Sequence, residues 1–212
     1  QVAGHVVIVR VDFNVPLADD GAGGRVITDT GRIHAALPTI DYLREHRARI
    51  LLLAHLGRPK GVVTPEASLE PVAQELSRVL SIDVPLAADL AQARDELNRA
   101  SDGGVVVLEN IRFDARETSK DPAERAALAR ELADLGDFFV SDGFGVVHRE
   151  QASVTELAAF LPHAAGRLVE RESAVFSQLL AQPQRPYVVI LGGSKVSDKL
   201  AVIGNLIPHV DR

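Results

Sequence analysis

The chain has 212 residues, of which 46% are hydrophobic, and a formal net charge of −6. This apolar content is enough for a sizeable core and excludes a disordered chain. The acidic balance excludes general nucleic-acid binding, the short apolar runs exclude a membrane span, and the lack of cysteine excludes disulfides and thiolate chemistry.

Short apolar runs alternate with helical patterns along the whole chain. Each run is apolar at nearly every position, which is typical of a strand covered on both faces. The predicted strands are Val6–Val11, Ile50–Ala54, Val84–Ala87, Val105–Leu108, Phe138–Ser141 and Tyr187–Leu191. The alternation predicts an α/β fold with a doubly wound parallel sheet, a Rossmann-like arrangement of three layers.

Helices are predicted between these strands from apolar spacing and from start and stop signals. The stretches are 33–43, 68–80, 122–136 and 166–181. Pro38 predicts a late start or a kink in the first helix, and Ser68 is a candidate cap for the second.

The chain divides best at a break rich in Gln and Pro. We predict a first domain over 1–181, a linker over 182–186, and one strand-helix unit over 187–212. Because such a unit cannot bury both of its faces, we expect it to begin a second domain whose remainder is absent. The chain contains no methionine, which also predicts a fragment.

Ligands of open parallel sheets bind at the carboxyl ends of the strands. The residues that follow the predicted strands there include many cations, although the chain is acidic: His55, Arg58, Arg112, Arg149, Lys195 and Lys199, with Arg32 at the start of the first helix. Arginine suits carboxylate and phosphate because its planar fork donates two hydrogen bonds. The pattern predicts a small anionic ligand.

Each of these residues has an ordinary structural interpretation when taken alone. A single arginine after a strand is more often a solvated charge, and Asp12 and Asn14 are common turn residues. Their coincidence across five loops favours a binding site. The sequence lacks the P-loop, G-x-G-x-x-G, H-E-x-x-H and G-x-S-x-G patterns, and we predict no metal site.

The loops resemble phosphoglycerate kinase in order and over nearly the whole chain. The matching strings are R-V-D-F-N-V-P-L at 10–17, G-R-I-H-A-A-L-P-T-I at 31–40, A-H-L-G-R-P at 54–59, L-E-N-I-R-F at 108–113, S-D-G-F-G-V-V-H-R at 141–149 and L-G-G-S-K-V-S-D-K at 191–199. The resemblance implies the first domain of a two-domain hinge kinase. It also implies reversible phosphoryl transfer between 1,3-bisphosphoglycerate with ADP and 3-phosphoglycerate with ATP in glycolysis, by a cytoplasmic monomer.

The resemblance also implies roles for individual residues. It places Asp12, Phe13, Asn14, Arg32, His55, Leu56, Gly57, Arg58, Arg112 and Arg149 on the side of 3-phosphoglycerate. It places Gly193, Ser194, Lys195 and Lys199 on the nucleotide side, with Arg32 and Lys195 as catalytic residues. ATP or ADP would act with Mg²⁺, whose ligand is expected in the absent half.

One motif departs from the family pattern, because 141–149 has glycine and valines in place of the commoner N-D-A-F-G-T-A-H-R. Arg149 is retained. We expect the 212 residues to bind the acid without turnover. The alternatives are a free-standing module that binds phosphorylated acids, an interaction protein with a basic rim, and a kinase for another acyl phosphate.

Overall fold

The computed structural model describes residues 2–19, 21, 23–192 and 200–211. The chain divides into two compact units, Gln1–Val169 and Glu170–Arg212. The predicted linker at 182–186 lies within the second unit, and the predicted domain boundaries stay a prediction.

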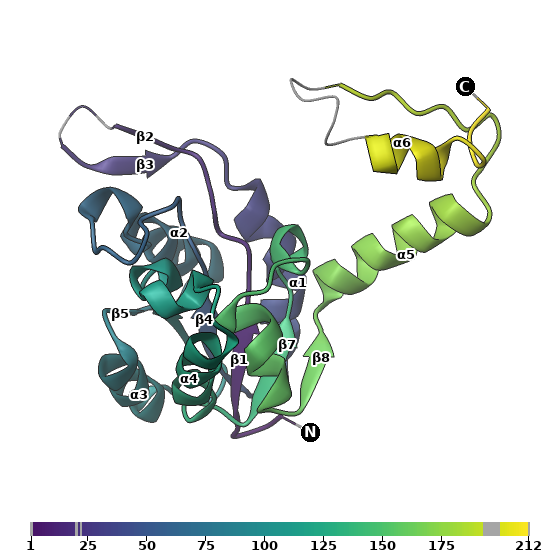
Figure 1. Cartoon of the computed structure of the whole chain (residues 1–212). Helices are drawn as coiled ribbons and strands as arrows, with labels where there is room; N and C mark the ends of the chain where they lie inside the picture. The colour runs from purple at the N-terminus through teal and green to yellow at the C-terminus, as the bar shows by residue number, and fades with distance from the viewer. Residues whose placement is uncertain (1, 20, 22, 193–199, 212) are drawn as a thin grey trace. The chain divides into compact units, whose positions relative to one another are not determined.

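The first unit contains a six-stranded sheet in the order β5-β6-β4-β1-β7-β8, in which each neighbouring pair is parallel (Figure 1). The strands are β1 (Val6–Arg10), β4 (Arg49–Leu53), β5 (Leu86–Ala87), β6 (Val105–Leu108), β7 (Phe138–Ser141) and β8 (His163–Ala165). A separate antiparallel hairpin consists of β2 (Leu17–Asp19) and β3 (Arg25–Ile27). The predicted α/β class and parallel sheet are confirmed.

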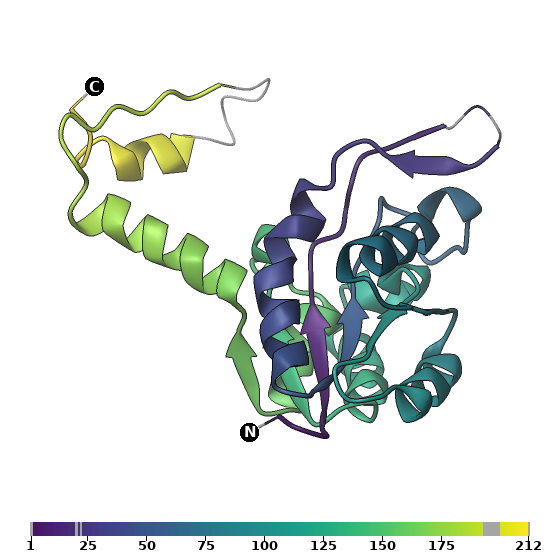
Figure 2. The ribbon, with the colours of Figure 1, turned by 180° about the vertical axis from the view of Figure 1, so that it is seen from behind.

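Helices cover both faces of the sheet. The α-helices are α1 (Gly31–Glu45), α2 (Glu70–Leu80), α3 (Leu90–Arg99), α4 (Pro122–Ala133), α5 (Arg167–Ala181) and α6 (Leu200–Leu206). Short 3₁₀ turns are η1 (Pro65–Ala67), η2 (Ile111–Phe113), η3 (Ala115–Thr118), η4 (Phe144–Val146) and η6 (Leu157–Ala159), and η5 (Ala152–Glu156) is a π-helical turn. In Figure 1 α4 lies in front of the sheet, and the view from behind in Figure 2 brings α1 to the front.

Alternation along β1 explains this layering. Val7 and Val9 pack with α1 and α2 in one core, whereas Ile8 packs with α3 and α4 in the other. All three side chains have no exposed surface. Burying a side chain of this size contributes about 1.5–3 kcal/mol, so a continuous apolar run stabilises both layers at once.

Two of the predicted elements need correction. The late start predicted for the first helix is wrong, because α1 begins at Gly31 and runs through Pro38. Tyr187–Leu191 forms no strand. Its backbone instead meets Asp211, whose side chain accepts from the Tyr187 amide at 2.7 Å, and a strand needs a neighbouring strand for its ladder.

Candidate active site

Loops after β1, β4, β6 and β7 form the candidate site, together with the start of α1. The structure brings the predicted substrate-side residues to this one edge of the sheet: Asp12, Phe13, Asn14, Arg32, His55, Leu56, Gly57, Arg58, Arg112 and Arg149. Since the strands are parallel and adjacent, their carboxyl ends meet there.

Backbone and side-chain hydrogen bonds tie three of the loops together at Gly57. The Gly57 amide donates to Oδ1 of Asn14 at 2.9 Å, and its carbonyl accepts from Nη1 of Arg112 at 2.7 Å. Gly57 has φ of +62°, a conformation that glycine adopts without strain. The peptide can therefore turn both of its polar groups toward neighbouring loops.

Arg32 and Asp12 form an ion pair between the start of α1 and the loop after β1. The Arg32 side chain is half exposed and that of Asp12 is largely buried. Arg32 is thus held at the rim, where its remaining guanidinium donors can reach a ligand in the crevice.

The side chains of Phe13 and Leu56 belong to the hydrophobic core. They are 0% and 5% exposed and pack in the same apolar cluster. Any contact with a ligand would use their backbone atoms. Their predicted binding role stays a prediction.

Arg112 and Arg149 carry guanidinium nitrogens that lack a protein partner. Nε of each is buried and makes no hydrogen bond with any described residue. Burial, and after it the neighbouring charges of Arg149 and Arg10, lower the pKa of Arg112 to about 10. Arg112 still carries its charge at neutral pH, so the site concentrates positive charge that an anion would relieve.

The prediction that His55 contributes positive charge to this patch is not supported by its surroundings. The side chain is 2% exposed. Burial is the largest cause that lowers the pKa of His55 to about 2, and the charges of four arginines contribute to the same shift: Arg10, Arg112, Arg149 and Arg32. His55 is therefore uncharged at neutral pH. Arg58 is exposed.

Sequence reasoning missed four buried polar residues beneath this edge, namely Arg10, Asn110, Glu117 and Ser153. Arg10 ends β1, and its Nη2 lies 3.3 Å from Nδ1 of His55. A charged residue inside the run V-V-I-V-R-V was a signal for it. The other three lie in loops and turns, where the sequence pattern carries no burial signal.

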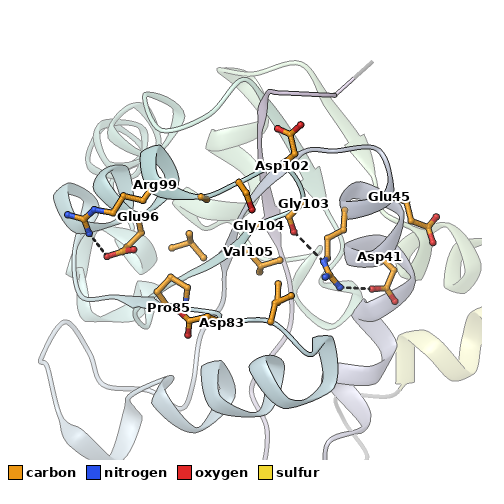
Figure 3. A pocket seen from close by; sticks show the side chains of 15 residues that line it. Asp41, Glu45, Asp83, Pro85, Glu96, Arg99, Asp102, Gly103, Gly104 and Val105 are labelled. Carbon is orange, nitrogen blue, oxygen red and sulfur yellow. Dashed lines mark hydrogen bonds and ion pairs between the residues drawn. The ribbon is translucent and has the colours of Figure 1, made fainter.

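A larger cavity lies elsewhere, at the amino ends of the strands. It has about 750 Å³ and is lined by Asp41, Glu45, Asp83, Glu96 and Asp102 among others (Figure 3). Two arginines line it as well, and Figure 3 shows both paired with acidic neighbours. This acidic lining would repel a phosphorylated acid, so the cavity is not the predicted site. A smaller pocket of about 190 Å³ borders Asn14 and Gly57.

The nucleotide side of the prediction cannot be placed. Gly193, Ser194, Lys195 and Lys199 lie outside the described residues. Within the described ranges, no group of three or more His, Asp or Glu side chains is arranged to hold a metal ion. A search of the same ranges for a helix both long enough and apolar enough to span a membrane found none.

Fold and site together define a parallel α/β domain with a cationic crevice at the carboxyl edge of its sheet, the arrangement used by enzymes of phosphorylated small molecules. A family model described as phosphoglycerate kinase matches residues 1–212. The chain therefore belongs to the phosphoglycerate kinase family.

Curated relatives and solved structures agree with this assignment. The chain is 57% identical over 211 residues to a phosphoglycerate kinase of Bifidobacterium adolescentis, and 55% identical to one of Clavibacter michiganensis. The solved structure of phosphoglycerate kinase from Coxiella burnetii has 38% identity and a TM-score of 0.82, and that from Pyrococcus horikoshii has 32% and 0.87. These matches cover 98–99% of the chain, which spans about half the length of each relative.

Proposed function

We propose that the chain is the acid-binding half of a glycolytic phosphoglycerate kinase, and that the crevice binds 3-phosphoglycerate and 1,3-bisphosphoglycerate. The observation that carries the proposal is the pair of buried Nε groups on Arg112 and Arg149 that have no hydrogen-bond partner in the described part of the chain, beside exposed Arg58. Phosphate oxygens would accept from these donors, and each such charged hydrogen bond contributes about 1.5–3 kcal/mol.

The remaining residues of the edge suit the other end of a phosphorylated acid. Asp12 and Asn14 offer oxygens for the hydroxyl of the acid, and Arg32 stands at the rim next to them. We propose that Arg32 stabilises the charge on the transferring phosphoryl group. In the forward direction the bond from phosphorus to the acyl oxygen breaks, a bond from phosphorus to the terminal oxygen of ADP forms, and a carboxylate leaves.

No general base is needed for this transfer, because the carboxylate of 3-phosphoglycerate is already ionised at neutral pH. The work left for the protein is to align two anions and neutralise their charge. Arginines meet that need, because they stay protonated and do not act as bases.

The nucleotide is proposed to be ATP or ADP with Mg²⁺. Among the described residues, no three or more His, Asp or Glu side chains are arranged to hold the metal. Lys195 and Lys199, with Gly193 and Ser194, are proposed to contact the nucleotide phosphates. We propose that the acid-binding half binds its ligand without turnover and that the enzyme is a cytoplasmic monomer free of nucleic acid and membrane.

Calorimetric titration with 3-phosphoglycerate tests the proposal, with unphosphorylated glycerate as a control ligand and two salt concentrations. We expect saturable binding of the phosphorylated acid alone, weaker at high salt. Arg149→Ala and Arg58→Ala should each weaken binding by about 2–4 kcal/mol. Arg99→Ala, which removes an exposed arginine at the opposite edge, is the matched control and should change little. Unchanged affinity in both site variants would exclude the crevice as the binding site of 3-phosphoglycerate.

A coupled assay of ATP formation addresses turnover separately. No activity is expected from the 212 residues with 1,3-bisphosphoglycerate and ADP. Appreciable ATP formation would show that this half carries a complete active site.

A further inference from the structure

Arg10 is a fully buried cation beneath the candidate site, at the end of the central strand β1. Each of its guanidinium nitrogens has an acceptor in the described structure. Nε donates to Oγ of Ser153 at 2.8 Å, Nη1 donates to the Val11 carbonyl at 2.5 Å, and Nη2 lies 3.3 Å from Nδ1 of His55. The side chain is thus fixed in one orientation.

Glu117 and Ser153 form the other end of this network, and neither has exposed surface. The Ser153 hydroxyl accepts from Arg10, so its single hydrogen goes to Oε1 of Glu117, at 2.7 Å. The Ser153 amide donates to Oε2 at 2.9 Å, and Nη2 of Arg10 lies 4.0 Å from Oε1. Burial raises the pKa of Glu117, while the charge of Arg10 and the two bonds from Ser153 oppose that rise.

The contact between Arg10 and His55 determines where the imidazole carries its hydrogen. A guanidinium only donates, so Nδ1 of His55 must accept and the ring hydrogen must lie on Nε2. The charged groups of the described residues that shift the pKa of the ring are all cations: Arg10 from β1, Arg32 from α1, Arg112 from η2 and Arg149 from the loop after β7. A second proton on the ring is therefore disfavoured from each side.

We propose that Glu117 and Ser153 are positioning residues, which hold Arg10 so that it fixes His55 as a neutral ring with its hydrogen on Nε2. With Nδ1 occupied by Arg10, Nε2 becomes a preset donor to an oxygen of the anionic ligand. The ligand's identity rests on the proposed function, whereas the tautomer is a property of the unliganded chain.

The positioning role and a simple charge effect predict opposite results for Glu117→Gln. Removing one negative charge makes the site more positive, so a pure charge effect would tighten the binding of an anion. Loss of positioning releases Arg10 and the ring, which removes the preset donor and weakens binding. The sign of the change in affinity separates the two.

The first measurement is the nitrogen-15 spectrum of the histidine rings in the unliganded 212-residue chain. His55→Gln identifies the His55 signals among those of the seven histidines. We expect one protonated Nε2 and one unprotonated Nδ1, unchanged from pH 8 down to about pH 5 because protonation is disfavoured. A ring that carries its hydrogen on Nδ1, or that is doubly protonated at neutral pH, overturns the proposal whether or not any variant folds.

The second measurement compares Glu117→Gln and Ser153→Ala with wild type in the same spectra and in 3-phosphoglycerate titrations. Both variants should give averaged ring signals, a titration midpoint raised toward that of free histidine, and affinity about tenfold weaker. Glu156→Gln is the control, because it removes the charge of another largely buried Glu–Arg pair, 2.6 Å from Arg125, without touching Arg10. It should keep the wild-type spectrum and affinity even where its stability falls.

The results also separate this inference from the proposed function. Tighter or unchanged binding in Glu117→Gln, with the wild-type tautomer retained, refutes the positioning role while 3-phosphoglycerate binding stands. If no chain binds 3-phosphoglycerate, the proposed function fails, and the spectra alone decide whether Glu117 and Ser153 set the tautomer.

Discussion

Asn110 ties the loop after β6, in which it lies, to two points of the connection between β4 and α2 through one buried amide. Its side chain is 2% exposed. Nδ2 donates to the carbonyls of Leu56 at 2.7 Å and Ala67 at 2.8 Å, and Oδ1 accepts from the Arg112 amide at 3.1 Å. Both donor hydrogens and the acceptor are thus used, and no water-exposed face remains to replace them.

Asn110→Ala would leave these three backbone groups without their partner. A buried polar group left unsatisfied costs about 1–3 kcal/mol, and three such groups that share one side chain should cost about 3–6 kcal/mol in unfolding free energy. The loss is a large part of the stability of an ordinary domain, about 5–15 kcal/mol. Affinity for 3-phosphoglycerate should fall as well, because Arg112 and the loop at Leu56 lose their common anchor.

Urea unfolding followed by circular dichroism measures the effect, with Asn98→Ala on the exposed surface of α3 as the matched control. The control should change stability by less than about 0.5 kcal/mol. A loss below about 1 kcal/mol in Asn110→Ala, close to that of the control, would refute the inference that the Asn110 amide holds these two connections together.

Three further predictions concern other parts of the chain. Gly166→Ala should destabilise the fold by more than about 2 kcal/mol in thermal unfolding, because the added Cβ would lie 2.6 Å from Cβ of Asp142. Gly204→Ala has open space around it in α6 and should be neutral or slightly stabilising. Equal changes in stability in the two variants would contradict this reasoning. Burial raises the pKa of Asp142, so its protonated carboxyl favours the folded state at low pH, and this contribution is lost as pH rises through the folded pKa. The stability of Asp142→Asn relative to wild type should therefore increase between about pH 4 and pH 7. A difference in urea midpoint, variant minus wild type, that decreases over this range would contradict the sign. Arg32→Ala in the full-length enzyme should lower kcat more than it raises KM for 3-phosphoglycerate, and a change in KM alone would exclude its proposed role.

The sheet could be predicted from the sequence because strands buried on both faces give continuous apolar runs. Helices and strands that give only a weak apolar signal were not predicted. Helix α3 buries only Ala93 and Leu97, and the three residues of β8 are all exposed, so neither leaves an apolar pattern. Tyr187–Leu191 shows the reverse case, an apolar run without a neighbouring strand to pair with.

The candidate site was predictable in its residue types but not in its electrostatics. Arg58, Arg112 and Arg149 could be placed at one edge, because the position after a parallel strand is fixed by topology. The neutral state of His55 could not, because it depends on burial and on cations that come from four different segments. The prediction that Ser68 caps the second helix is wrong in position, because the N-cap of α2 is Leu69. The Ser68 hydroxyl accepts from the Glu70 amide at 3.2 Å and donates to Glu109 at 2.7 Å, which links the start of α2 to the loop after β6.

The two edges of the sheet carry charges of opposite sign, and this explains how an acidic chain can select an anion. The carboxyl edge holds Arg10, Arg32, Arg112 and Arg149, while the amino edge holds the acidic cavity of Figure 3. A net charge of −6 repels large polyanions from most of the surface. A small phosphorylated acid is attracted only where cations lie close together, and buried guanidinium groups interact with it more strongly than exposed ones because less water screens them. If the proposed function holds, selectivity for a small anion comes from where the arginines are placed, and the total charge of the chain favours it by excluding larger competitors.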